Sequence, residues 1–350
     1  GTKAAARELC AGDEIVLPAS VRQGYALNGW YTNAALTEAW TAGDPMPAGD
    51  LTLYARWKRT DETAVSVPFT FEETEGGLTI TGFTGEFGKV EIPESINGQT
   101  VVGIADYAFE GNAYMQVVSA PASVESIGEN AFADSALYSI TMAGVKTIGA
   151  HAFEGCASLA EVVLPDTLTA LGAYAFQDCS ALLNIELPQS VVALSEGLFS
   201  GCEWLVSVGL PAGLETIGAG AFRGCARIAA IDVGANVSEI SSDAFDGCSA
   251  LTAFSSADGN MYYKTVDGVL FNKAGTQLMA YPAGRADSIY AIPGGVTMIA
   301  ANAMRSSRIT ELRLNDELTA IGEGALIEDE LVHFCGFNFP CVDSGFGENA

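Results

Sequence analysis

Hydrophobic residues recur along the middle of the chain with a period of 23 residues. Each period contains a cysteine, a phenylalanine three residues before it, and an aliphatic residue five positions before the phenylalanine. The cysteines are Cys156, Cys179, Cys202, Cys225 and Cys248; the phenylalanines are Phe153, Phe176, Phe199, Phe222 and Phe245; the aliphatic residues are Ile148, Leu171, Leu194, Ile217 and Ile240. A fixed period of this size predicts a solenoid, in which each period forms one coil stacked on the previous one.

A single period also predicts the structure of one coil. After Cys156, alternating aliphatic residues face inward from a short strand: Leu159, Val162 and Leu164. Pro165 ends that strand because proline has no amide hydrogen for the ladder. Gly172 permits a tight bend, and Phe176 fills the coil. We therefore expect one strand per coil, a parallel sheet built from successive coils, and a core that forms only by stacking.

The phenylalanine position of the repeat can be followed beyond the strict 23-residue period in both directions. It is found at Phe109 and Phe132, and it returns after a gap as Met304 and Leu326. Within the gap, strand-like residues 268–271 and 277–281 flank Asn-Lys-Ala-Gly, which predicts a hairpin. We expect this hairpin, at about residues 258–285, to be inserted into the array. A hairpin around Gly76-Gly77 and the Phe- and Gly-rich end after Leu326 are expected to cap the two open ends.

The recurring Leu-Pro, Ile-Gly and Ala-Phe-x-x-Cys elements resemble the BspA-type (Treponema pallidum-type) leucine-rich repeat over about residues 78–350. The resemblance implies a mainly β, or α/β, solenoid: a right-handed leucine-rich repeat superhelix. A parallel sheet would form one side, with short turns or 3₁₀ helix on the other. It also implies a secreted or cell-surface bacterial protein.

Residues 1–60 do not share the period. Their aromatic runs Gly-Tyr, Gly-Trp-Tyr and Thr-Leu-Tyr-Ala-Arg-Trp resemble, over about residues 12–58, the Listeria–Bacteroides repeat. That resemblance implies a small β-grasp-like module of bacterial surface proteins, in which the family has a further strand ahead of the residues that match here. Trp30, Tyr54 and Trp57 are expected to fill the core of this module. We expect three parts: this module at 1–60, a linker and the start of the capping hairpin at 61–77, and the solenoid at 78–350.

The net charge of −27 lies entirely outside the first 60 residues, which contain six basic and six acidic side chains. The rest of the chain therefore holds ten basic and 37 acidic residues. Such a surface repels phosphate backbones and anionic lipids, so nucleic-acid binding is not expected. No apolar run approaches the roughly 18 residues of a membrane span, so no membrane insertion is expected within this fragment. We expect a monomer.

The repeated cysteines are expected to form a reduced ladder inside the solenoid. Side chains at equivalent positions of stacked coils run parallel, which is poor geometry for a disulfide. Buried thiols behave as small apolar groups. Cys335 and Cys341 lie outside this ladder, where a disulfide remains open, and Cys10 stands alone.

The chain contains few candidates for catalysis or metal binding. His151 stands in a turn whose position varies in residue type between coils, which favours an exposed filler. His333 and Cys335 lack an orienting Asn or Asp at a recognisable spacing. The segments Asp258-Gly259-Asn260 and 328–330 carry oxygen ligands for weak calcium binding, but solvated turns are favoured. We expect no catalytic residues, no metal site and no cofactor.

Surface recognition remains the favoured function. Outward residues of successive strands are expected to align in two columns. One is Ser119, Thr141, Val163, Glu186, Gly209, Asp232 and Ser255; the other is Val117, Ser139, Glu161, Asn184, Ser207 and Ala230. Trp204 and Arg227 should be neighbours one coil apart, and both residue types are favoured at binding hot spots. Simple shielding of a coil edge by Trp204 is the competing interpretation. Arg305, Arg308 and Arg313 form a basic cluster in the sequence.

We therefore expect a non-catalytic surface protein whose solenoid binds protein or glycan ligands. The residues expected to line the ligand surface are Trp204, Arg227, Glu161, Asn184, Glu186, Ser207 and Asp232. The alternative is a structural spacer or scaffold module of a larger surface protein with no ligand of its own. An enzyme is the least favoured class.

Overall fold

The computed structural model describes residues 25–32, 39–40, 51–59, 68–85, 88–326, 333–336 and 339–343, with only the backbone for residues 25–29, 39, 56–59 and 333–343. The chain divides into two compact units, Gly1–Pro68 and Phe69–Ala350. The described residues are strands, turns and loops, and they include no helix that could cross a bilayer.

The N-terminal unit contains a three-stranded antiparallel sheet in the order β2-β1-β3. Its strands are β1 (Tyr25–Tyr31), β2 (Ala39–Trp40) and β3 (Tyr54–Arg59). Trp30 stands between Trp40 and Ala55 in the register and is partly buried, while Tyr54 is 38% exposed. The side chain of Trp57 lies outside the described residues.

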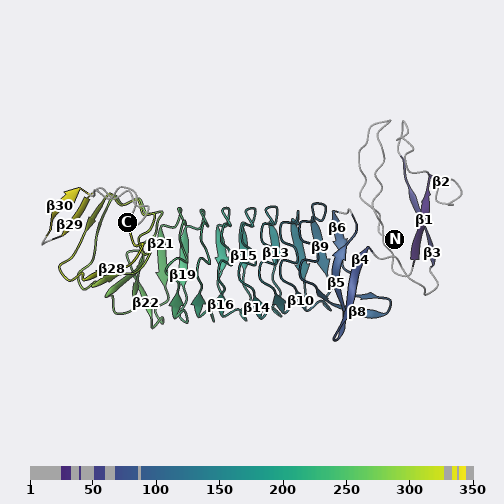
Figure 1. The fold of residues 1–350 in the computed structure, drawn as a ribbon, viewed down its shortest axis with the longest axis horizontal. Coiled ribbons are helices and arrows are strands. Elements are labelled where there is room, and N and C mark those ends of the chain that lie inside the picture. The colour runs from purple at the N-terminus through teal and green to yellow at the C-terminus, as the bar shows by residue number, and fades with distance from the viewer. Residues whose placement is uncertain are drawn as a thin grey trace. The chain divides into compact units, whose positions relative to one another are not determined.

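The second unit is a solenoid whose coils follow one another along its length (Figure 1). One strand from each coil lies on the same side of the solenoid, and we call these strands the first sheet. They are β6 (Lys89–Glu91), β9 (Val117–Ala120), β11 (Ser139–Met142), β13 (Glu161–Val163), β15 (Asn184–Glu186), β17 (Ser207–Gly209), β19 (Ala230–Val233) and β21 (Ala253–Ser256). These strands pair in parallel within the groups β6-β9-β11-β13, β15-β17 and β19-β21.

A second sheet runs along another side of the same coils. It contains β8 (Gln99–Ile104), β10 (Ser126–Ile127), β12 (Thr147–Ile148), β14 (Ala170–Leu171), β16 (Ala193–Leu194), β18 (Thr216–Ile217) and β20 (Glu239–Ile240). The expectation of one strand per coil is therefore wrong, because each coil contributes two. Most strands of the second sheet have only two residues, one of which is an inward aliphatic residue. Such strands are too short to show an alternating pattern in the sequence. Pairing with the neighbouring coils defines them.

The interior is a stack of phenylalanine rings. Phe132, Phe153, Phe176, Phe199 and Phe222 each have 0% exposure. Neighbouring rings are nearly parallel, with centroids 5.2 Å apart for Phe153 and Phe176 and 5.9 Å apart for Phe176 and Phe199. The predicted aromatic core is thereby confirmed, and each ring is buried by the coils on either side of it.

The cysteine ladder lies beside these rings. All five repeat cysteines are fully buried, and four of them donate from Sγ to the carbonyl of the phenylalanine 26 residues earlier, as Cys202 does to Phe176 at 3.0 Å. Cys156 follows the same rule with Phe132 at 24 residues. Ser135, 4% exposed, fills the equivalent slot of the preceding coil, where its Oγ lies 3.4 Å from the Sγ of Cys156. Burial raises the pKa of the Cys156 thiol to about 11.

Close stacking requires glycine at several of the bends that follow second-sheet strands, whereas Ser195 and Ser241 stand at the equivalent positions after β16 and β20. Gly172 does not have a positive φ, but a Cβ there would lie 2.3 Å from the amide nitrogen of Ala150 and 2.4 Å from the carbonyl carbon of Gly149. Gly128 and Gly149 show the same close approach to the preceding coil. The bends therefore set how closely consecutive coils approach.

Replacing Gly172 by alanine is expected to lower the free energy of unfolding by about 1–3 kcal/mol, because the backbone atoms that the methyl group meets cannot move without separating two coils. Gly234→Ala is the matched control, since a Cβ at Gly234 has nothing within 4 Å and its φ is not positive. Guanidinium unfolding of both variants tests this. Equal stability of the two variants would contradict the stacking role of Gly172.

Additional strands extend the two ends of the array. The antiparallel hairpin of β4 (Phe69–Thr74) and β5 (Gly77–Phe83) joins the second sheet beside β8, which also pairs with β7 (Ser95–Ile96). After the regular coils, the chain continues through β22 (Tyr263–Val266), β23 (Val269–Asn272), β24 (Gln277–Ala280), β25 (Ile289–Ala291), β26 (Met298–Ile299), β27 (Glu311–Arg313), β28 (Ala320–Ile321), β29 (His333–Gly336) and β30 (Phe339–Asp343).

The regular ring stack ends at Phe245, where the repeat is interrupted. Phe254 meets the ring of Phe245 edge-on, at 5.0 Å between centroids. β22, β23 and β24 form an antiparallel meander, and β24 then pairs in parallel with β26, which resumes the second sheet. The inserted strands are therefore part of the solenoid wall.

Candidate functional site

The outward residues of the first sheet align in two columns. Parallel register places Ser139 beside Glu161, Asn184 beside Ser207, Glu186 beside Gly209 and Asp232 beside Ser255. Within each hydrogen-bonded group the predicted columns are therefore confirmed. We call this surface, from β9 to β21, the first sheet face.

Hydrogen bonds between coils hold several of these side chains in place. Ser207 Oγ donates to Asn184 Oδ1 at 2.7 Å, and Ser255 Oγ donates to Asp232 Oδ1 at 2.7 Å. The carboxylate of Glu186 lies over Gly209, where a Cβ would come within 1.6 Å of its Oε2. The polar groups of this face are thus ordered by their neighbours.

Trp204 and Arg227 meet on adjacent coils, as their spacing predicts. The guanidinium carbon of Arg227 lies 3.5 Å from the centroid of the Trp204 ring, which is a close cation–π contact. Trp204 is still 47% exposed. One face of the indole is therefore covered while much of the ring remains accessible to solvent.

A column of apolar side chains, most of them exposed, precedes the strands β11 to β19 of the first sheet face. These residues stand one position before each strand, and main-chain bonds such as that from the Val206 amide to the Leu183 carbonyl join them from coil to coil. We call them the entrance column: Tyr138, Ala160, Leu183, Val206 and Ala229. Tyr138, Leu183 and Val206 are 44–48% exposed. The sequence analysis missed this column, although the repeat register could have identified it.

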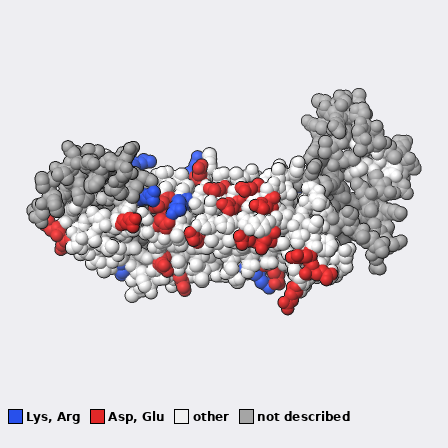
Figure 2. Space-filling model, in the orientation of Figure 1, with Lys and Arg blue, Asp and Glu red and all other residues white. Residues whose placement is uncertain are grey.

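The acidic residues of the first sheet face have no basic partner within the described part of the chain. Glu161 accepts a long hydrogen bond of 3.5 Å from the Tyr138 hydroxyl, and Asp232 accepts one from Ser255. No ion pair among the described residues includes Glu161, Glu186 or Asp232. In the view of Figure 2, acidic side chains spread over the coils, while most basic ones gather toward the C-terminal end.

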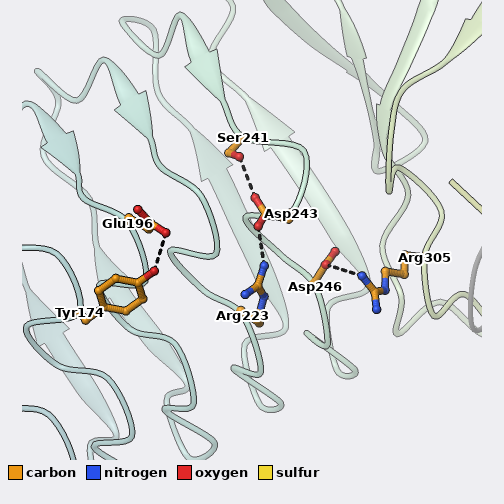
Figure 3. A network of polar contacts seen from close by, with 7 residues as sticks. All are labelled: Tyr174, Glu196, Arg223, Ser241, Asp243, Asp246 and Arg305. Carbon is orange, nitrogen blue, oxygen red and sulfur yellow. Dashed lines mark hydrogen bonds and ion pairs between the residues drawn. The ribbon is translucent and has the colours of Figure 1, made fainter. Parts of the chain in front are cut away.

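The turn side of the coils is different, because several of its polar groups are paired with one another (Figure 3). Tyr174 donates to Glu196, which raises the pKa of the tyrosine. Arg223 forms an ion pair with Asp243 at 2.5 Å. Arg305 forms an ion pair with Asp246 at 3.3 Å across the interruption of the repeat. Within the described residues, partner charges are thus present on this side, while the carboxylates of the first sheet face form no ion pair.

The other residues considered for chemistry have structural environments. His151 has a positive φ of 57°, stacks on Tyr174 and shares a hydrogen bond with Glu154 at 2.5 Å. Asn260 is fully buried, donates to two carbonyls and accepts from two amides. Arg313 is paired with Glu311. Among the described residues no group of three His, Cys, Asp or Glu side chains is arranged to hold a metal ion.

A groove of about 520 Å³ lies over the N-terminal end of the second sheet. Hydroxyl, carboxylate and glycine groups line it, including Thr79, Ser126, Thr147 and Glu72. Residues 328–330, Cys10 and the side chains of His333, Cys335 and Cys341 lie outside the described residues, so the predictions made for them stay predictions.

Two family profiles match the sequence. The "BspA type Leucine rich repeat region" matches in six copies over residues 84–144 and 140–252. The "Listeria-Bacteroides repeat domain" matches residues 1–56.

Solved structures extend the similarity over the solenoid. A leucine rich cell surface protein from Faecalibacterium prausnitzii is 30% identical, with 76% of this chain and 75% of that chain covered and a TM-score of 0.68. A leucine-rich repeat protein from Bacteroides ovatus, 24% identical with 78% and 70% covered, has the same fold with a TM-score of 0.61.

A curated Gly-rich protein of Evansella cellulosilytica is 35% identical over 69 residues, which are 20% of this chain and 7% of that protein. The chain therefore matches only a small part of this curated relative's length. The repeats, the solenoid and the similarity to the F. prausnitzii cell-surface protein together place the chain in the BspA-type leucine-rich repeat family, with a Listeria–Bacteroides repeat at its N-terminus.

Proposed function

We propose that the protein is exported to the bacterial surface or secreted, and that its first sheet face binds protein or glycan ligands without catalysing a reaction. The family includes a bacterial cell-surface protein, which supports the location. Trp204 and Arg227 would anchor the ligand. Polar side chains of the two columns would add hydrogen bonds and charge contacts: Glu161, Asn184, Glu186, Ser207 and Asp232.

The main support for this proposal is that large apolar side chains are exposed at the start of strands that carry ordered polar groups. Isolated exposed apolar residues are common on soluble proteins. Here Trp204, Leu183 and Val206 instead share two neighbouring coils, and this concentration is typical of binding surfaces.

Binding to an array of host matrix proteins, bacterial surface proteins and glycans tests the proposal. We expect at least one ligand to bind at physiological salt, and the double variant Trp204→Ala/Arg227→Ala to weaken that binding by about tenfold or more, as expected for a hot-spot pair. Tyr262→Ala is the matched control, because Tyr262 is 55% exposed and lies outside the first sheet face.

If the array shows no binding above a scrambled acidic control, the binding role is wrong and the spacer role becomes the better account of the fold. Ligands retained in full by the double variant would place the binding surface elsewhere on the chain. Fractionation of the native bacterium separately tests the proposed location.

A further inference from the structure

We propose that the partner of the first sheet face is a basic, partly apolar polypeptide segment that lies across the coils from β11 to β19. This inference rests on the function proposed above and specifies the chemical class of its ligand. It combines two properties of the surface, an exposed apolar column and carboxylates without counter-charges.

Each coil from β11 to β17 exposes at least one large apolar side chain. Tyr138, Leu183 and Val206 belong to the entrance column, and Val163, 72% exposed, stands at the end of β13 in register with Thr141. The Tyr138 hydroxyl reaches Glu161, which shows that the entrance column and the first sheet face form a single surface. Covering these side chains would remove apolar area from water, which is the main driving force for association.

The charged part of the surface determines the sign of the partner. Glu161, Glu186 and Asp232 come from β13, β15 and β19, and none of them has an ion-pair partner within the described residues. Lysine or arginine side chains of a partner would supply the missing charges. Complementary charges also raise the association rate and exclude acidic competitors.

Other classes of partner fit this surface less well. Nucleic acids and anionic membranes are repelled by the unpaired carboxylates. Sugar rings stack on exposed aromatic faces, whereas the exposed side chains of Val163, Leu183 and Val206 are aliphatic. A polypeptide can instead present both aliphatic and cationic side chains along one strand.

The length of the surface sets the length of the segment. From β11 to β19 there are four steps between coils, so the surface is about 19 Å long at about 4.8 Å per step. An extended chain advances about 3.3 Å per residue, so about six residues would cover it. An eight-residue peptide is therefore an adequate probe.

The test uses the full chain and two fluorescent eight-residue peptides. One carries three lysines, three leucines and two glycines; the other has glutamate in place of each lysine. Anisotropy titrations are expected to show saturable binding of the lysine peptide, weakened by added salt, and none of the glutamate peptide.

Two triple variants then locate the binding site. Glu161→Gln with Glu186→Gln and Asp232→Asn is expected to weaken binding of the lysine peptide by about tenfold or more. The control, Glu125→Gln with Glu215→Gln and Glu239→Gln, removes the same charge at or just before strands of the second sheet and should change the affinity by less than about twofold. All six side chains are exposed, and circular dichroism checks that both variants remain folded.

Failure of the lysine peptide to bind would overturn the inference, and so would equal weakening by the two triple variants, which would indicate attraction by net charge alone. These outcomes are distinct from failure of the proposed function. An array ligand that is neutral or acidic, and that is lost on Trp204→Ala/Arg227→Ala, would support surface binding while contradicting a basic partner.

Discussion

Replacing Phe176 by alanine is expected to lower the free energy of unfolding by about 3–5 kcal/mol. The ring is fully buried between Phe153 and Phe199, so its removal leaves a cavity that two further rings cannot fill without moving their coils. Chemical unfolding of the variant, followed by circular dichroism, measures the loss.

Tyr114→Ala is the matched control for this experiment, because it also removes an aromatic ring, but one that is 55% exposed. Surface substitutions of this kind usually change stability by less than about 0.5 kcal/mol. A Phe176→Ala variant as stable as the Tyr114→Ala variant would mean that the ring stack does not hold the coils together.

Alkaline pH is expected to destabilise the native chain through its buried thiols. Replacing Cys202 by serine should remove the contribution of one of these thiols. Burial raises the pKa of the Cys202 thiol to about 12, whereas an exposed thiol titrates near about 8.5. Above about pH 8.5 the unfolded chain therefore releases a proton that the folded chain keeps. Stability falls as pH rises, by about 1.4 kcal/mol per pH unit for each such thiol.

The measurement is the difference in free energy of unfolding between the native chain and Cys202→Ser as a function of pH. This difference should be constant below about pH 8. Between about pH 9 and 11 the native chain should lose about 1.4 kcal/mol of stability per pH unit relative to Cys202→Ser. Ser135 already occupies the equivalent buried position in another coil, where it contacts Cys156. A serine in place of Cys202 should therefore fit the same position. Because other titrating groups are common to both proteins, a difference that does not change with pH would refute the effect of the buried thiol.

The core was predictable from sequence because its residues repeat at one interval. Phe176 and Cys179 have the same environment as their equivalents 23 residues away, so the spacing alone places them on one interior line. The alignment of Trp204 with Arg227 follows from the same interval, since each stands two residues after a repeat cysteine.

Features that depend on contacts between coils were not predictable in this way. The two-residue strands of the second sheet lack a pattern of their own and exist only as pairs. Ser135 departs from the cysteine pattern yet occupies its buried slot. Glu186 forms no ion pair with a described residue, and this depends on where the basic side chains lie in the folded chain, which the order of residues does not specify.

In the regular coils, the described bonds between coils join immediate neighbours, as the Cys202 thiol and the Phe176 carbonyl do. A whole coil can therefore be duplicated or lost by recombination between similar gene segments without disturbing the contacts of more distant coils. Such events would lengthen or shorten the surface in increments of about 4.8 Å, which gives evolution a simple way to match its reach to new partners.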